Sequence, residues 1–457
     1  DFIIIAMYFR RKLLGLFGLS VCGGCVIRVL LNSKHILAEE KAKPNDKIDE
    51  LRELKLKQAQ VIFRHGARTP LAVIPDISQA NYTKDQFSFD VAHTIFKYEE
   101  LSLDGGPKGH SAYDEQGDIK PKLKGGVNVG MLTPLGQEQM YLFGKELKRE
   151  YMNKAKLLSP EYNPEEIYVR STNIKRTRTS ARCVLAGMYG STQLNSLQEP
   201  LKLYVDNLNT DFLIPQTSDC HILHQITHDA VVYWGDLPEI KRDRLLVEKN
   251  IGLDSTNGGK KLHFIYARDD IVARKTHGLP VPKVLLELED LIDRRAVEML
   301  LYSFCGLHET EQPLATKLTS GRFLSCVLEN MQKKNGPKLY LFSAHDSTIV
   351  GVLHALNIFD NQWPPFAANI RFELYEDSKK TEYVKIKYNG QDKVVRGCEK
   401  ELCTLTDFKK AISKYTVQKK EYESLCASNT LGETAKVIQG MVKDDETKER
   451  SNTPVGM

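Results

Sequence analysis

The sequence predicts an α/β body in which a mixed sheet carries helices on both faces. Three apolar runs of strand type, residues 59–63, 166–169 and 338–344, each lead directly into an arginine or a histidine. Apolar residues at helical spacing follow the second and third runs. In open α/β sheets, ligands bind at the edge where the carboxyl ends of the strands meet. We therefore expect the three polar strand ends to form one site.

The first run leads into the heptad Arg-His-Gly-Ala-Arg-Thr-Pro at residues 64–70. The guanidiniums of Arg64 and Arg68 on either side of an imidazole suit a doubly charged oxyanion such as a phosphate. Their charge disfavours protonation of His65, and a neutral imidazole can attack a held phosphorus atom. An isolated Arg-His pair is more often a basic turn, so this interpretation requires a second half-site.

The third run supplies that second half-site, because it leads into His345 and Asp346. Ile349, Val350 and Leu353 follow at helical spacing. We expect His345 to donate to a phosphate oxygen and Asp346 to protonate the leaving alkoxide. Alone, an aspartate at a helix start is usually an N-cap, but the pairing with the heptad favours the catalytic role.

The second run ends at Arg170, which occupies the same strand-end position as Arg64 and His345. The helix that follows should bury Ile174, Ala181, Val184, Leu185 and Met188 and end before Gly190. We expect three further arginines on this helix to form a solvated face: Arg176, Arg178 and Arg182.

Other segments give weaker signals. Thr133-Pro134 should begin a helix, with its buried face marked by Leu135, Leu142, Phe143, Leu147 and Tyr151. Residues 370–374 alternate as a strand with one buried face, and 383–388 should pair with 394–395 across the turn at 389–390. Residues 408–415 should form a last helix. The stretch 71–130 reads mostly as loops, and 205–320 as a less periodic segment with helical pieces.

Composition excludes some functions. The chain has 457 residues, of which 41% are hydrophobic and 27% charged, with a net charge of +5. These values are ordinary for a globular protein, and so mild a charge does not favour nucleic-acid binding. Only two tryptophans are present, and no basic stripe is interleaved with aromatic residues, so we expect no nucleic-acid partner.

Histidines and cysteines do not form a clear metal motif. His221, His224 and His228 have a spacing that could share one helix face, but no carboxylate completes a ligand pattern, so we favour no metal. Cys398 and Cys403 lack a second ligand pair, which leaves a local disulfide or two free thiols open. We expect four cysteines in apolar segments to be inert buried thiols: Cys183, Cys220, Cys305 and Cys326.

The first residues resemble a targeting leader. Residues 10–12 are basic, 13–27 are apolar, and no acidic residue occurs between Met7 and Glu39. The apolar run is shorter than the roughly 20 residues that span a bilayer. The pattern fits a secretory signal or a mitochondrial transit peptide, and the basic residues on both sides of the run favour the second slightly. We expect residues 1–45 to be leader and linker, and the charged residues 431–457 to be a disordered tail.

The heptad at 64–70 and the string Ser-Ala-His-Asp at 343–346 resemble the histidine acid phosphatase family. The resemblance covers about residues 56–426. Within the family, the sequence is similar to a branch of mitochondrial enzymes that act on lysophosphatidic acid. The strings that carry this finer similarity lie at residues 105–108, 169–174, 344–346, 358–360, 363–367 and 396–398.

The resemblance implies His65 as nucleophile and Asp346 as proton donor, without a metal or other cofactor. It also implies that the phosphate is held by Arg64, Arg68, Arg170 and His345. The expected catalytic body comprises residues 46–204 and 311–430, with the loops at 71–130 contributing to a smaller cap. The cap itself is expected to be mostly helical and to come mainly from residues 205–310. The resemblance favours a mitochondrial location, with the secretory pathway as the alternative.

The expected function is hydrolysis of a phosphate monoester through a phosphohistidine, converting lysophosphatidic acid to monoacylglycerol and phosphate. One alternative is a phosphatase for a soluble polyanion such as an inositol phosphate. Another is a catalytically silent phosphate- or lipid-binding protein, although binding alone needs neither His65 nor Asp346. The expected partner is a small lipid phosphate, and peripheral membrane contact would fit it. We expect a monomer, although no sequence pattern establishes the oligomeric state, acyl chain, leader cleavage site or pH optimum.

Overall fold

The computed structural model describes residues 54–111, 114, 121–215, 217, 219–253 and 261–427, which all belong to one compact unit. The predicted leader and tail lie outside these residues. Within them, no helix is both long enough and apolar enough to cross a membrane.

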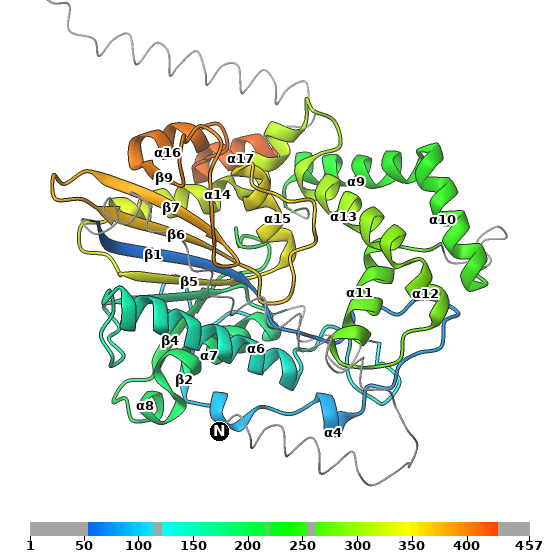
Figure 1. Ribbon diagram of the computed structural model, residues 1–457, viewed down its shortest axis with the longest axis horizontal. Helices are drawn as coiled ribbons and strands as arrows, with labels where there is room; N and C mark the ends of the chain where they lie inside the picture. The colour runs from blue at the N-terminus through cyan, green and yellow to red at the C-terminus, as the bar shows by residue number, and fades with distance from the viewer. Residues whose placement is uncertain are drawn as a thin grey trace, which may run out of the picture. The chain divides into compact units, whose positions relative to one another are not determined.

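A mixed sheet organises the described chain, as the sequence predicts (Figure 1). Its strand order is β2-β4-β3-β5-β1-β6-β7-β8, and β9 pairs with β7. β2, β4, β3, β5 and β1 are parallel neighbours, whereas β6, β7, β8 and β9 pair in antiparallel fashion. The strands are β1 (Lys55–Arg64), β2 (Tyr98–Ser102), β3 (Ile167–Ser171), β4 (Leu201–Val205), β5 (Leu339–Ala344), β6 (Asn369–Glu376), β7 (Glu382–Tyr388), β8 (Gln391–Lys393) and β9 (Leu402–Thr404).

Helices cover both faces of this sheet, which confirms the predicted layers (Figure 1). On one face, α6 (Pro134–Leu147) and α7 (Lys175–Tyr189) pack on Val61, Phe63 and Leu341. On the other, α14 (Gln312–Gln332), α15 (Asp346–Ala355) and α16 (Leu405–Ile412) pack on Ile62 and Phe342. Alternate residues of β1 and β5 thus face opposite layers, as the period of a strand requires.

The predicted helix start at Thr133-Pro134 is confirmed, because the Thr133 hydroxyl accepts a hydrogen bond from the Gly136 N–H and Pro134 opens α6. Two residues assigned to its buried face are exposed, Leu135 at 41% and Leu142 at 54%. Short elements within described residues add α4 (Lys84–Phe87), a 3₁₀ turn (Ala92–Thr94), a π-helical turn (Lys148–Lys154), α8 (Ser191–Asn195) and α17 (Lys419–Ala427).

A group of helices follows β4 and has a core of its own. They are α9 (His221–Asp236), α10 (Pro238–Ile251), α11 (Phe264–Thr276), α12 (Lys283–Glu287) and α13 (Glu289–Cys305). Their buried residues include Trp234, Val247, Phe264 and Ile292, and this core continues into Trp363 of the body. Residues 205–310 are therefore largely helical where described, whereas their status as a separate cap stays a prediction.

Some strands and cysteine partners were not foreseen. β2 lies in the stretch read as loops, and it joins the sheet through β4. Cys398 and Cys403 form the local disulfide that the sequence left open. Cys220 was expected to be an inert thiol, which is wrong, because it is bonded to Cys426. Among described residues, Cys183, Cys305 and Cys326 are free thiols.

Candidate active site

Parallel pairing brings the three predicted strand ends to one edge. In β1 and β5, Arg64 lies opposite Ala344, and the His65 N–H donates to the Ala344 carbonyl over 3.2 Å. On the other side of β5, β3 continues into Thr172, whose N–H donates to the Ser343 carbonyl. The residues that follow β1 and β5, His65 and His345, therefore lie side by side, with ring centroids 5.7 Å apart.

His65 is buried and held in one tautomer. Its Nδ1 lies 2.9 Å from the carbonyl oxygen of Gly66, which can only accept, so Nδ1 carries the hydrogen and Nε2 the lone pair. Burial lowers the pKa of His65 well below its ordinary value, and Arg176, Arg64 and Arg68 lower it further. The imidazole is therefore neutral, as the sequence predicts for a nucleophile between guanidiniums.

Gly66 is required by the packing of this turn against α6. A Cβ added at Gly66 would lie 2.2 Å from the carbonyl oxygen of Gly136. The backbone after β1 can therefore lie directly on the first turn of α6 only if residue 66 has no side chain.

Asp346 is the first residue of α15, and its carboxylate is surrounded by donors. Its Oδ2 lies 2.8 Å from Arg64 Nη2 and accepts from Trp363 Nε1 over 3.0 Å. Burial by itself would raise the pKa of Asp346, but Arg64, Arg68 and His345 hold it well below the ordinary carboxylate range. Asp346 is consequently ionised when no phosphate is bound.

The aromatic ring of Phe366 lies beside the heptad. Its ring lies 4.4 Å from the guanidinium carbon of Arg64, 5.9 Å from that of Arg68 and 6.0 Å from the ring centroid of His65. Arg64 Nη1 also donates to the Pro364 carbonyl over 2.7 Å. The sequence supported the string at 363–367 only by resemblance, whereas the structure makes it part of the site.

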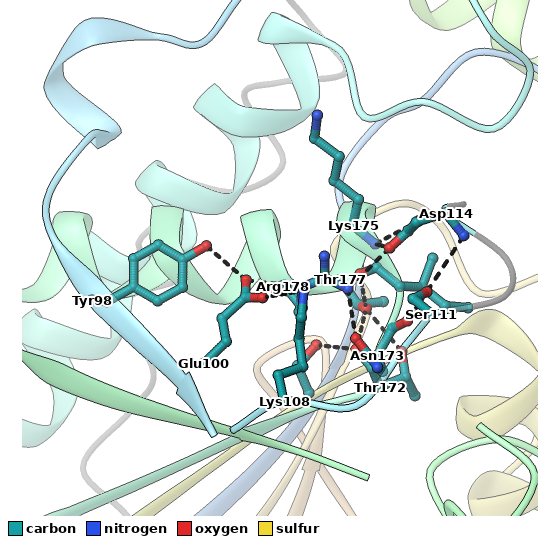
Figure 2. Close-up of polar contacts among 12 residues, drawn as sticks. Tyr98, Glu100, Lys108, Ser111, Asp114, Thr172, Asn173, Lys175, Thr177 and Arg178 are labelled. Atoms are coloured by element: carbon teal, nitrogen blue, oxygen red, sulfur yellow. Dashed lines mark hydrogen bonds and ion pairs between the residues drawn. The ribbon is translucent and has the colours of Figure 1, made fainter. Parts of the chain in front are cut away.

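His345 is fixed from two sides. Its Nε2 lies 3.0 Å from the hydroxyl of Thr172, which is paired in turn with the Thr177 hydroxyl at 2.8 Å (Figure 2). Its Nδ1 lies 3.4 Å from Arg176 Nη2. Burial lowers the pKa of His345 well below its ordinary value, and Arg176 adds to this shift. Both histidines of the site are thus neutral.

Arg176 is the residue that sequence reasoning missed. We expected Arg176, Arg178 and Arg182 to form a solvated face, which is wrong, because all three are buried. Arg178 donates to Glu100, Asp114 and Asn173, as Figure 2 shows, and Arg182 donates to Asp90. Arg176 instead occupies the first turn of α7 and points to His345.

Arg170 has a different environment from the other predicted phosphate ligands. Its Nη2 donates to Asp211 Oδ1 over 2.7 Å, and its guanidinium carbon lies 3.9 Å from the ring centroid of Phe212. No described contact joins it to His65, His345 or Asp346. A phosphate-binding role for Arg170 stays a prediction, and these contacts do not favour it.

The remaining guanidinium, that of Arg68, is paired with Asp269 of α11 through two contacts of 2.9 Å. Three buried arginines, Arg64, Arg68 and Arg176, thus surround two neutral imidazoles. We call these five side chains the phosphate site. Such a cluster of fixed donors suits a dianion whose charge spreads during phosphoryl transfer.

The structure offers no metal site in the part of the chain that it describes, where no group of three or more His, Cys, Asp or Glu side chains could hold an ion. His221, His224 and His228 are exposed on α9, and the rings of the last two stack with centroids 6.3 Å apart.

Comparison with known families agrees with this geometry. The family model described as histidine phosphatase superfamily (branch 2) matches residues 55–235 and 260–389. Lysophosphatidic acid phosphatase type 6 of Mus musculus is 34% identical over 87% of this chain and 94% of its own length. The Homo sapiens protein of the same name is 35% identical over 83% of this chain and 88% of its own.

More distant proteins share the fold. Prostatic acid phosphatase of Mus musculus is 24% identical over 74% of this chain and 79% of its own length. The apo form of Hafnia alvei phytase superposes with a TM-score of 0.52 at 13% identity, over 80% of this chain and 98% of its own. At such low identity, the structural match shows the fold alone.

Proposed function

This chain belongs to the histidine phosphatase superfamily (branch 2) and is a phosphoric monoester hydrolase, and from that premise we propose that it hydrolyses lysophosphatidic acid through a phosphohistidine at His65. One observation carries the proposal. His65 is buried and neutral, with Nδ1 bonded to a carbonyl and Nε2 left for attack among three guanidiniums.

In the first half-reaction, Nε2 of His65 attacks the phosphorus atom and the bond to the alcohol oxygen breaks. Asp346 gives its proton to that oxygen, which leaves as the hydroxyl of the monoacylglycerol. Arg64, Arg68 and Arg176 donate to the non-bridging oxygens and stabilise the charge on them in the transition state. We assign this third position to Arg176 rather than Arg170, because only Arg176 contacts His345.

In the second half-reaction, water attacks the phosphohistidine and the bond from phosphorus to Nε2 breaks. The carboxylate of Asp346 takes the proton of the attacking water, and orthophosphate leaves. His65 returns to the neutral tautomer that its contact with Gly66 maintains.

The ionised state of Asp346 in the free protein is compatible with its role as an acid. A phosphate dianion beside it adds negative charge and competes for Arg64, and both effects raise the pKa of the carboxyl. His345 can also adapt to a bound phosphate, because the Thr172 hydroxyl can either accept from its Nε2 or donate to it. When the hydroxyl accepts, Nε2 carries the hydrogen and Nδ1 is an acceptor. When the hydroxyl donates, Nδ1 carries the hydrogen and can donate it to phosphate.

The substrate assignment is supported by the relatives named for lysophosphatidic acid. A cleft of about 690 Å³ between α11 and α13 reaches Arg268, whose guanidinium carbon lies 4.5 Å from the ring of Trp363. Its lining is mainly charged, but it includes the apolar side chains of Val272, Val297 and Leu301. In this proposal, the acyl chain contacts these three side chains. Trp363, which contacts Arg268 of the cleft and donates to Asp346, then lies between the cleft and the proton donor.

A phosphate-release panel tests the substrate. It compares lysophosphatidic acids of increasing chain length with glycerol 3-phosphate and with inositol phosphates. We expect kcat/KM to rise with chain length and to exceed the value for inositol phosphates by more than about tenfold, since apolar burial adds ~0.8 kcal/mol per methylene. A higher rate on inositol phosphates would assign a soluble polyanion, and release from no substrate would assign a silent binding protein.

Peripheral contact with an anionic lipid surface is also part of the proposal, and α10 is the surface that supports it. Its inner face buries Ile240, Val247 and Ile251. Its outer face exposes Leu245 and Leu246, at 41% and 46%, between cations at helical spacing: Lys241, Arg242 and Lys249. An outer face that mixes leucines with cations complements anionic headgroups.

Vesicle flotation tests this surface, with neutral vesicles and with vesicles that contain phosphatidylserine. We expect Leu245→Glu/Leu246→Glu to abolish binding to the anionic vesicles and to leave hydrolysis of a short, soluble phosphate ester unchanged. Leu142→Glu is the matched control, because Leu142 is also an exposed leucine, at 54%, on a different helix, α6. If the α10 double variant and Leu142→Glu float with anionic vesicles to the same extent, α10 is not the membrane contact.

The proposed location is the mitochondrion, on the pattern of residues 10–34, and the proposed state is a monomer. The two disulfides among described residues are typical of proteins from oxidising compartments, an observation that favours the alternative of the secretory pathway. Imaging of residues 7–45 fused to a fluorescent protein tests the location, and secretion of the fusion would contradict it. Light scattering of the purified protein measures its molar mass and so tests whether it is a monomer.

A further inference from the structure

Asp269 holds the guanidinium of Arg68 from a distant part of the chain. It lies on α11, 201 residues after Arg68, and its side chain is buried. Its Oδ2 accepts from Arg68 Nη1 over 2.9 Å, and its Oδ1 lies 2.9 Å from Arg68 Nη2. The same carboxylate accepts from the Leu71 N–H over 2.7 Å. One side chain of α11 therefore fixes both the arginine and the backbone that follows it.

The geometry of this pair determines the direction of Arg68. Paired contacts through both Nη atoms fix the plane of a guanidinium and its rotation, which a single contact does not. Arg68 Nη1 also donates to the Thr69 carbonyl over 3.1 Å. The edge that includes Nε is turned away from Asp269, and the Phe366 ring centroid lies 5.9 Å from the guanidinium carbon of Arg68. Arg68 is thus held in advance in one orientation.

Asp269 also sets the charge of the phosphate site. Arg64, Arg68 and Arg176 bring three positive charges, and both imidazoles are neutral. Among the contacts that the structure describes, Asp346 pairs with Arg64 and Asp269 pairs with Arg68, so Asp269 offsets part of this positive charge whether or not Asp346 is protonated.

We propose that Asp269 is a positioning residue for phosphoryl transfer, which orients Arg68 toward the transferring group from α11. The inference rests on the proposed function, because it concerns the transition state of that reaction. Donors fixed before the reaction stabilise a transition state without having to reorganise. The helical segment that follows β4 thereby helps to fix the orientation of Arg68 at the edge of the sheet where the reaction takes place.

The neighbouring residue provides a matched control. Asp270, on the same helix, is also buried and pairs with Arg274, with Oδ2 lying 2.8 Å from Nη2. The contacts that the structure describes for this pair do not involve Arg64, Arg68 or Arg176. Asp269→Asn and Asp270→Asn therefore each remove one buried charge from α11, and only the first removes it from Arg68.

The experiment compares the two variants in steady-state kinetics, in inhibition by vanadate and in binding of orthophosphate by calorimetry. Vanadate adopts the trigonal bipyramid of a phosphoryl-transfer transition state, so it reports orientation more sensitively than orthophosphate does. For Asp269→Asn we expect kcat/KM to fall about 10- to 100-fold, mainly through kcat, and vanadate inhibition to weaken by a similar factor. Orthophosphate affinity should change less. Asp270→Asn should lower Tm and keep kcat/KM within about twofold.

Two results would overturn the inference. One is a folded Asp269→Asn protein with wild-type kcat/KM and vanadate inhibition; the other is tighter vanadate binding, which would make Asp269 a competitor of phosphate. If Asp269→Asn does not fold, Asp269→Glu takes its place, with the same expected direction and the same overturning results. Failure of the proposed function is distinguishable, because the wild type itself would then release no phosphate.

Discussion

Arg64, which is buried, and Asp346, which is partly exposed, form an ion pair in which Nη2 lies 2.8 Å from Oδ2. The pair joins the end of β1 to the start of α15, so it links the arginine of the heptad to the proton donor. It also determines where the proton resides before the reaction. With the pKa of Asp346 held below the ordinary range, the proton for the leaving alcohol enters with the substrate.

The first prediction concerns the pH dependence of kcat/KM. A phosphate monoester loses its second proton at about pH 6. Because Asp346 in the free protein is ionised, the productive encounter uses the monoanion, so kcat/KM should fall about tenfold per pH unit above that value. Below pH 6, it should stay level to about pH 5, because the lowered pKa keeps His65 neutral. A fall between pH 6.5 and 5 would contradict this state of His65.

A second prediction concerns the acid. Asp346→Asn should lower kcat/KM for an alkyl phosphate by about 10² to 10⁴, the usual contribution of a general acid. For p-nitrophenyl phosphate, whose leaving group needs little protonation, the loss in the first step should be less than about tenfold. Burst kinetics with both substrates measure the difference. An equal loss for both leaving groups would show that Asp346 does not act as the acid.

A third prediction separates Arg176 from Arg170. Arg176→Ala should lower kcat/KM by about 10² to 10³, as removal of a transition-state donor does. Arg170→Ala should leave KM and kcat within about threefold but lower the free energy of unfolding by about 3–5 kcal/mol, since it leaves Asp211 buried without its arginine. Kinetics and chemical denaturation of both variants check this. Loss of activity in Arg170→Ala at unchanged stability would restore the assignment made from the sequence.

The strand ends of the site were predictable because each combines two local signals. An apolar run followed by a polar residue defines the end of a buried strand, and parallel pairing then sets Arg64 opposite Ala344 without further information. The direction of the pKa shift of His65 was also predictable, since Arg64 and Arg68 lie within three residues of it, although burial and Arg176 lower the pKa more. Burial and the contact with Arg176 depend on the tertiary fold, which local signals do not give.

Arg176 was missed because burial of α7 depends on residues far away in the sequence. Arg178 and Arg182 on the same helix pair with Glu100, Asp114 and Asp90, and these partners come from a stretch that reads as loops. A usable signal was nevertheless present. Arg176 lies in the first turn of the helix after β3, as Asp346 lies in the first turn of the helix after β5. Asp269 had no such signal, because only the tertiary fold brings α11 to Arg68.

A fourth prediction concerns the disulfides. Cys220–Cys426 closes a loop of 206 residues, whereas Cys398–Cys403 closes one of 5. Loop-closure entropy then predicts that serine replacements at the first pair cost about 5 kcal/mol of unfolding free energy, and those at the second about 2 kcal/mol. Chemical denaturation of the two double-serine variants measures which disulfide contributes more to the free energy of unfolding. A greater loss from the short loop would contradict the entropic account.

The most direct test of the central claim is to trap the phosphorylated protein and locate the phosphate. Rapid acid-free quenching with labelled substrate, followed by mass spectrometry, should find an acid-labile phosphate on His65, attached to Nε2, in the wild type and none in His65→Ala. Label that persists in His65→Ala, or that maps to His345 or another residue, would contradict the account.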